Sequence, residues 1–200
     1  IDIYNHGDND YNIKFNHHQL GLNIVGVNMK NLILDLSAHF DYYNYHNMLV
    51  AGDAFGRDVI LHDDHYVSYH ANLHYDSENM GVFPTRGAKF NAEYAYFTDN
   101  FTQYDNHLGF SELSAMWRIS FALNSRFTLQ PMAYGRLLFG RDIPYIRQNV
   151  IGGQWFGHYF EQQMPFVGVG NVELTDPHFI AMQLKARQRL GTNNYILVHV

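Results

Sequence analysis

Apolar and polar residues alternate with a period of two along most of the chain. From Asn31 to Tyr42 the even-numbered positions are apolar, and Ile33 is the one exception to the polar odd-numbered set. Similar alternating runs cover residues 67–76, 89–96, 113–123, 127–137 and 180–187. A period of two places successive side chains on opposite faces of a β-strand. The pattern therefore predicts an all-β, antiparallel fold whose strands have one apolar and one polar face.

The length of the runs and of their connections makes this prediction more specific. Several runs reach about ten residues, which is what a tilted strand needs to cross a bilayer. Short connections are expected at 26–30, 77–87, 124–125 and 191–194, and long ones at 43–58, 99–109 and 140–177. Short turns at one side and long loops at the other are typical of outer-membrane barrels. About nine strands fit this scheme, counting partial strands at both ends.

Residues 11–25 also alternate, but their apolar phase changes near His17-His18. A β-bulge inserts one extra residue into a strand and shifts the faces of the residues that follow. The phase change therefore predicts a bulge at this point.

The composition favours a strand that faces lipid. Aromatic residues make up 16% of the chain, with 15 Tyr and 15 Phe, and charged residues only 16%, against about 25% in soluble domains. No apolar run approaches the roughly 18 residues of a membrane helix. We therefore expect a transmembrane β-barrel in a bacterial outer membrane, in contact with its lipid. The alternative is a soluble β-sandwich or lipocalin-like barrel, in which Leu34, Tyr69 and Trp117 would form a dry centre.

Charge and cysteine content exclude two other classes. The net charge is −6 without a basic run, so no nucleic-acid surface is expected, and the absence of Cys excludes disulfides and thiolate chemistry. The sequence starts at Ile1 without a signal peptide, and 195–200 reads as a strand that stops. We expect residues 1–200 to be a single barrel segment that is truncated at both ends; its oligomeric state stays open.

Two stretches resemble the outer-membrane assembly-factor superfamily, also called the bacterial surface antigen barrels. Phe83-Pro84-Thr85-Arg86-Gly87 resembles a turn of these barrels that contains Pro84 and Gly87. Ile143-Pro144, followed by Asn149-Val150-Ile151-Gly152-Gly153, resembles the entry to their long sixth extracellular loop. The resemblance implies a barrel of about sixteen strands, within the range of bacterial barrels, of which this chain would be about strands five to thirteen.

The continuation is similar to a narrower group. The stretch from Gln162 to Gly168, which includes Pro165 and Phe166, resembles the barrel attached to patatin-like phospholipases of Bacteroidetes-type bacteria. At the place of the superfamily's Arg-Gly-Phe/Tyr loop motif, residues 156–160 read Phe-Gly-His-Tyr-Phe and contain no Arg. A role of that loop arginine in relatives is therefore not transferable to this chain.

The resemblance implies a membrane module that anchors or serves a periplasmic patatin-like domain N-terminal to this chain. The segment itself is not expected to be an enzyme, because a patatin-like hydrolase needs a Gly-x-Ser-x-Gly elbow. The nearest pentapeptide, Gly109-Phe110-Ser111-Glu112-Leu113, lacks the second Gly. Two alternatives remain: a barrel for protein assembly or secretion, and a passive porin-like channel.

The polar faces of the strands carry the candidate functional residues. Histidine and carboxylate side chains between His62 and His74 could in principle bind zinc. However, residues four apart on a strand are separated by roughly 13 Å, so we expect neither a metal site nor a cofactor. Mixed charges instead predict a network that braces the barrel wall. The expected lumen-facing polar residues are Asp35, His39, His70, His74, Glu93, Arg118, Arg136, Lys185 and Arg187.

The long segment 140–177 is rich in glycine and aromatic residues. A solvent-exposed loop would rarely carry so many large apolar side chains. We therefore expect this segment to fold back into the barrel lumen.

Overall fold

The computed structural model describes most of the chain. The described residues are 2–5, 8–50, 64–80, 83–98, 109–140, 143–144, 147–153, 156, 162–169, 174–191 and 194–200. Their regular structure consists of strands, which confirms the predicted all-β class. Within these residues, no helix is long and apolar enough to cross a membrane.

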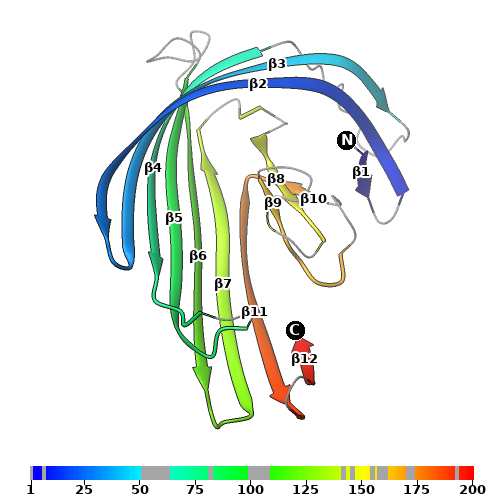
Figure 1. Ribbon diagram of the computed structural model, residues 1–200. Helices are drawn as coiled ribbons and strands as arrows, with labels where there is room; N and C mark the ends of the chain where they lie inside the picture. Colours follow the sequence, from blue (N-terminus) through cyan, green and yellow to red (C-terminus); the bar gives the residue numbers. More distant parts are fainter. Residues whose placement is uncertain are drawn as a thin grey trace.

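Nine strands form one antiparallel sheet, in the order β1-β2-β3-β4-β5-β6-β7-β11-β12. Their bounds are β1 Asp2–Asn5, β2 Asp8–Met29, β3 Leu32–Val50, β4 Asp64–Asp76, β5 Arg86–Thr98, β6 Phe110–Ala122, β7 Phe127–Phe139, β11 His178–Arg189 and β12 Tyr195–His199. Figure 1 shows the sheet curling into a wall with a concave side. In the described part of the chain this wall is not closed, because β1 and β12 are its two edges.

A small second sheet lies on the concave side of the wall (Figure 1). It is formed by β8 (Asn149–Ile151), β9 (Gln163–Met164) and β10 (Leu174–Asp176). β8 pairs antiparallel with β10 and parallel with β9. All three strands come from the long connection between β7 and β11, so the predicted folding back of this connection is confirmed for the described residues. We call the described residues between 147 and 169 the folded-in segment, and the face of the wall that they cover the inner face.

The two faces of the wall differ as the alternation predicts. Leu34, Tyr69 and Trp117 lie on the outer face and are 36%, 42% and 46% exposed, whereas Asp35 and Arg136 are 7% and 1% exposed. A soluble sandwich would bury the first set and expose the second. The apolar residues of the alternating runs therefore do not form the core, which excludes the sandwich alternative.

The β2–β3 hairpin is longer than expected. β2 has 22 residues and β3 has 19, and their pairing continues from Met29↔Leu32 to Tyr11↔Val50. Residues 43–50 were expected in a long loop, and this prediction was wrong. Asn and His residues are common in loops, which suggested a loop here. In the structure, the backbone groups of β2 and β3 pair with each other through this stretch. The hairpin extends well beyond the other strands (Figure 1). Its strands are also longer than the about ten residues that a strand needs to cross a bilayer.

The bulge predicted near His17-His18 was also misplaced. The β2–β3 register is regular through these residues and shifts between Lys14 and Phe15 and again between Val25 and Val27. The apolar phase changes because Phe15 packs on an aromatic cluster of the inner face, whereas Leu20 lies 75% exposed on the outer face. The backbone keeps its alternation, and it is the apolar face that changes side.

The remaining connections follow the predicted alternation of lengths. β2 and β3 are joined by a two-residue turn, Lys30-Asn31, so residues 26–29, which were expected in this turn, belong to β2. β6 and β7 are joined by residues 123–126. Asn124 Oδ1 accepts hydrogen bonds of 2.8 Å from the backbone N–H of Arg126 and of Phe127, which closes the second turn. These turns and the 77–85 connection lie at one end of the wall, which we call the short-turn end. The other end is the long-loop end; residues 51–63 and 99–108 lie outside the described residues.

Candidate functional site

A buried ion cluster holds the folded-in segment against the wall. Glu112 on β6 accepts a fork of hydrogen bonds from Arg136 on β7, with Nη2 2.5 Å from Oε2, and a further bond of 3.1 Å from Arg147 Nη2. Arg136 Nη1 also donates to Arg147 O (2.9 Å) and to Asn149 Oδ1 (2.8 Å). We call Glu112, Arg136, Arg147 and Asn149 the loop clamp.

The loop clamp is almost completely removed from solvent. Arg136 is 1% exposed, Glu112 7% and Arg147 8%. Buried ions are tolerated only when they are paired and their remaining donors are satisfied. Two guanidinium groups share one carboxylate here, and Arg136 Nη1, which the carboxylate does not take, donates to the carbonyl and amide oxygens of the folded-in segment. The Arg147 guanidinium also lies over the Phe97 ring at 4.3 Å from its centroid, a cation–π contact.

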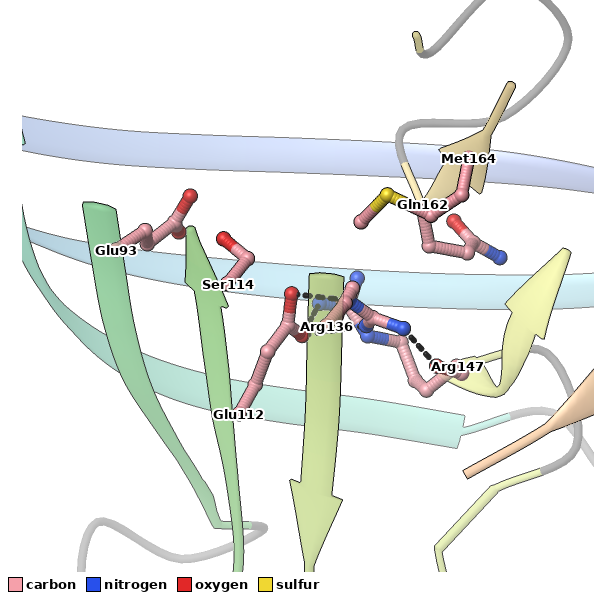
Figure 2. Close-up of a pocket in the computed structure, with 7 residues that line it drawn as sticks. All are labelled: Glu93, Glu112, Ser114, Arg136, Arg147, Gln162 and Met164. Atoms are coloured by element: carbon pink, nitrogen blue, oxygen red, sulfur yellow. Dashed lines mark hydrogen bonds and ion pairs between the residues drawn. The ribbon is translucent and has the colours of Figure 1, made fainter. Parts of the chain in front are cut away.

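A small cavity of about 70 Å³ adjoins the loop clamp. Figure 2 shows Glu93 and Ser114 on one side of it and Gln162 and Met164 of the folded-in segment on the other. This volume is enough for a few water molecules, each of which needs at least about 10–15 Å³. The lining is polar and suits hydration rather than a large ligand.

Further contacts extend along the folded-in segment. Tyr134 on β7 donates its hydroxyl to Pro165 O and accepts a bond of 2.9 Å from Gln183 Nε2. The ring of Phe156 lies against Tyr134 at 5.0 Å, and the ring of Phe166 against Phe179 at 6.3 Å. The segment is therefore held by ion pairs at its start and by aromatic contacts further along.

A second polar cluster lies at the short-turn end of the inner face. Glu78, in the 77–85 connection, accepts hydrogen bonds from Arg118 Nε (3.1 Å) and Nη2 and from Ser120 Oγ (2.7 Å). Gln130 Nε2 in turn donates to Ser120 Oγ at 2.8 Å. We call Glu78, Arg118, Ser120 and Gln130 the turn clamp, because it ties the connection to β6 and β7.

The 77–85 connection also contacts β11 and β12 through Phe83. Arg187 on β11 donates to Phe83 O at 3.2 Å, and its guanidinium contacts the rings of Phe83 and Tyr195, at 5.6 and 5.2 Å from their centroids. Gly87 follows with φ +108°, and a Cβ there would lie 2.3 Å from Ser77 O. Only glycine combines this backbone conformation with so close a neighbour, which explains Gly87 in the turn motif.

Histidine–carboxylate contacts form a third set on the inner face, across β2 to β5. His17 Nε2 lies 2.7 Å from Asp41, His70 Nδ1 2.6 Å from Glu93, and His74 Nε2 3.7 Å from Asp35. These contacts join strands in pairs and so brace the wall laterally. Within the part of the chain that the structure describes, no three such side chains converge as a metal site would require. His62 and Asp63 lie outside this part.

One of these contacts has the order of groups found in hydrolase triads. His70 Nε2 lies 2.7 Å from Ser68 Oγ, and Glu93 lies on its other ring nitrogen. A nucleophile must reach a substrate carbonyl, but Ser68 is 0% exposed. The arrangement fixes the His70 ring and does not offer an accessible nucleophile.

The comparison with known families agrees with this architecture. The family model of the OMP85 superfamily matches residues 2–200. The chain belongs to the OMP85 superfamily. No curated protein matches the chain. The superfamily is one of outer-membrane β-barrels, which supports the transmembrane β-barrel predicted from the alternation, while the closer resemblance to patatin-linked barrels stays a prediction.

Several polar residues expected in the lumen of this OMP85 chain lie in the clamps and pairs described above. The structure brings His70 together with Glu93, and also with His39, whose ring centroid is 4.5 Å from that of His70. Lys185 lies half-buried on β11, and Arg187 bonds Thr128 and Phe83. Of the motif residues, Pro165 is buried, Phe166 is 41% exposed, and Gly152 and Gly153 have φ of 137° and 75°.

Sequence reasoning did not find the acidic halves of the two clamps. Arg118 and Arg136 were expected on the polar face, but their partners Glu78 and Glu112 were not. Glu112 has the same parity as Ser114 and Arg118, so extending the alternating run backwards by one polar position would have included it. Glu78 and Arg147 lie in connections without periodicity, and no sequence signal marks them.

Proposed function

We propose that this OMP85 chain forms the lipid-facing wall of a bacterial outer-membrane barrel that anchors a periplasmic patatin-like domain of the same protein. The observation that carries the membrane part is the outward apolar face, with Leu34, Tyr69 and Trp117 exposed and the charged residues Glu112 and Arg136 buried inside. Many large apolar side chains are exposed along the outer face. Such a surface suits contact with hydrocarbon rather than with water.

The patatin-like part rests on the stretch from Gln162 to Gly168, which resembles barrels attached to such hydrolases. The structure adds that Gln163, Met164 and Pro165 of this stretch are buried against the wall. We infer that the stretch serves the barrel as packing and that lipid hydrolysis belongs to the attached domain. The test is the full reading frame: a Gly-x-Ser-x-Gly domain upstream of Ile1 supports the anchor, and small periplasmic repeats alone support an assembly or secretion barrel.

The second candidate, an assembly or secretion barrel, is favoured by the superfamily itself. A passive porin is disfavoured by the folded-in segment, which the loop clamp ties to the inner face near the long-loop end of the wall. Conductance of the full-length protein in a planar bilayer tests this third reading. Large, steady conductance would support an open channel and contradict a plugged barrel.

The outer face can be tested by charge insertion in the full-length protein. Ala115 is exposed on the outer face, and Ala115→Arg should lower the free energy of unfolding from lipid by about 2–4 kcal/mol if it faces the membrane core. Asn91→Arg is the matched control, because Asn91 lies on the inner face opposite Met116. Urea titrations in liposomes measure both, and equal losses would contradict the assignment of faces.

A further inference from the structure

A larger cavity lies between the inner face of β4 to β7 and the folded-in segment. Its volume is about 470 Å³, within the range of about 300–1,000 Å³ that small-molecule sites usually have. One wall is polar and comes from β4 and β5, with His74, Asn91 and Glu93. The opposite wall has a different chemistry.

Methionine and phenylalanine side chains line that opposite wall. Met116 on β6 and Met132 on β7 interrupt the polar pattern of the inner face, and Met164 and Phe156 of the folded-in segment meet them. Met132 and Met164 are each only 7% exposed. Methionine is unbranched and flexible, and it adapts to apolar chains of variable shape. The apolar wall therefore offers a surface for a hydrocarbon chain in an otherwise polar interior.

Two cations lie next to this apolar wall on the short-turn side. In the strand register, Lys89 on β5 lies directly opposite Arg118 on β6, and Arg118 lies opposite Met132 on β7. Like charges directly opposite each other are unfavourable unless they are compensated. Asp76 lies 3.3 Å from Lys89, and Glu78 takes the Nε and Nη2 side of Arg118. In the part of the chain that the structure describes, Glu78 leaves Nη1 of the guanidinium as a donor for an anion.

We propose that this cavity binds an amphipathic molecule with one acyl chain and an anionic head, such as a fatty acid or a lysophospholipid. The acyl chain lies along Met116, Met132, Met164 and Phe156, and the anionic head lies between Lys89 and Arg118 towards the short-turn end. His74, Asn91 and Glu93 form the hydrated side. The inference rests on the proposed barrel only in placing this cavity in its interior, and it adds a ligand that the anchoring role does not require.

Equilibrium binding to the full-length protein in detergent tests the proposal with three radiolabelled probes. These are palmitate, 1-palmitoyl-lysophosphatidylglycerol and the uncharged 1-monopalmitoylglycerol. The double variant Met116→Gln/Met132→Gln keeps side-chain length but makes the wall polar, and it should weaken binding of the anionic probes at least about tenfold. Met182→Gln is the matched control, because Met182 is 81% exposed on the outer face; it should leave binding unchanged.

The head group is tested by Lys89→Gln. This variant should weaken binding of palmitate and of the lysophospholipid about fivefold, and leave binding of monopalmitoylglycerol within about twofold. Saturable binding of both anionic probes supports the shared chemistry, and binding of only one identifies the source. Absence of saturable binding, equal losses with Met182→Gln, or equal affinity for the uncharged probe would overturn the proposal.

Folding of each variant is checked by the shift of the native band on unheated gels. If the double variant does not fold, Asn91→Phe fills the cavity from the polar wall and should abolish saturable binding while Met182→Gln retains it. Unchanged binding in Asn91→Phe overturns the proposal. The Ala115→Arg experiment tests the barrel and the binding experiment tests the cavity, so each can fail alone.

Discussion

The loop clamp and the turn clamp lie at opposite ends of the inner face, and each holds a connection between strands against the wall. Each ties a connection to β6 and β7 through a carboxylate and an arginine. The Glu112 carboxylate takes two arginines, and the three side chains are at most 9% exposed. The Glu78 carboxylate is similarly buried, with its side chain 5% exposed, but it takes only one arginine, Arg118, whose side chain is 24% exposed. The two clamps therefore differ in the number of cations and in how deeply the arginines are buried.

The difference follows from what each clamp has to hold. The described residues of the 77–85 connection already form local hydrogen bonds. Asn79 Oδ1 accepts from the backbone N–H of Thr85 (2.9 Å) and of Arg86 (3.0 Å), and Ser77 Oγ accepts from the backbone N–H of Ala88. The long connection between β7 and β11 has a larger ordering cost, since the entropy of closing a loop grows with its length. A buried anchor with two cations offsets that larger cost, whereas a short and locally bonded turn needs less.

The largest effect is expected from Glu112→Ala. This change leaves Arg136 and Arg147 buried without their shared carboxylate, and removal of one partner of a buried ion pair costs about 3–5 kcal/mol. The free energy of unfolding of the full-length protein should fall by this amount in urea titrations. Hydrogen exchange should rise at 147–151, because the loop clamp no longer holds the start of the folded-in segment.

Glu93→Ala is the control for this variant. Glu93 is also an inner-face carboxylate, but its side chain is 37% exposed and its ion pair is with a single His70 ring instead of two arginines. Its removal should cost at most about 1 kcal/mol and leave exchange at 147–151 unchanged. Equal losses in the two variants would show that burial does not separate the loop clamp from other inner-face contacts.

The next effect concerns two glycines: Gly87 at the start of β5, next to the 77–85 connection, and Gly168 in the folded-in segment. Gly87→Ala must adopt φ +108° and places a Cβ 2.3 Å from Ser77 O, whereas at Gly168, with φ +92°, nothing lies within 4 Å of the added Cβ. Backbone strain of this kind costs about 1–3 kcal/mol, and the backbone clash puts Gly87→Ala at the upper end, near 3 kcal/mol. Gly168→Ala should cost about 1 kcal/mol.

Midpoints of urea unfolding of both variants measure this difference. We therefore expect the short connection to be sterically tighter, although the arginine of its ion pair is less buried than those of the loop clamp. A loss in Gly168→Ala as large as that in Gly87→Ala would contradict the idea that the short connection is held mainly by local geometry.

The wall was largely predictable, because each strand carries its own signal. Leu34, Tyr69 and Trp117 recur on one side of alternating runs, and that period is a property of single strands. The lengths of β2 and β3 were not predictable, since the hairpin continues through Asn and His residues that only cross-strand pairing keeps extended. Likewise, the phase change near His17 has two possible causes, a bulge or a change of apolar face, and the pattern alone does not separate them.

Only some residues of the two clamps were predictable from the sequence. Arg118 and Arg136 lie on strands, so parity places them on the inner face. Glu78 and Arg147 lie in connections whose course depends on how distant parts of the wall come together. Ion pairs between a strand and a connection depend on this tertiary placement and leave no period in the sequence.

The smallest effect is expected from Glu78→Gln, which sharpens the comparison of the two clamps. The amide keeps an acceptor for Ser120 but loses the charge that faces Arg118, and a hydrogen bond to a charged group contributes about 1.5–3 kcal/mol. Because one acceptor remains and the Arg118 side chain reaches solvent, we expect a loss of about 1 kcal/mol. Added salt should shrink this loss, since exposed charges are screened, while the loss in Glu112→Ala should not change. A salt-independent loss of 3 kcal/mol or more would make the turn clamp the equal of the loop clamp, and the length of the connection would then not explain how deeply its anchor is buried.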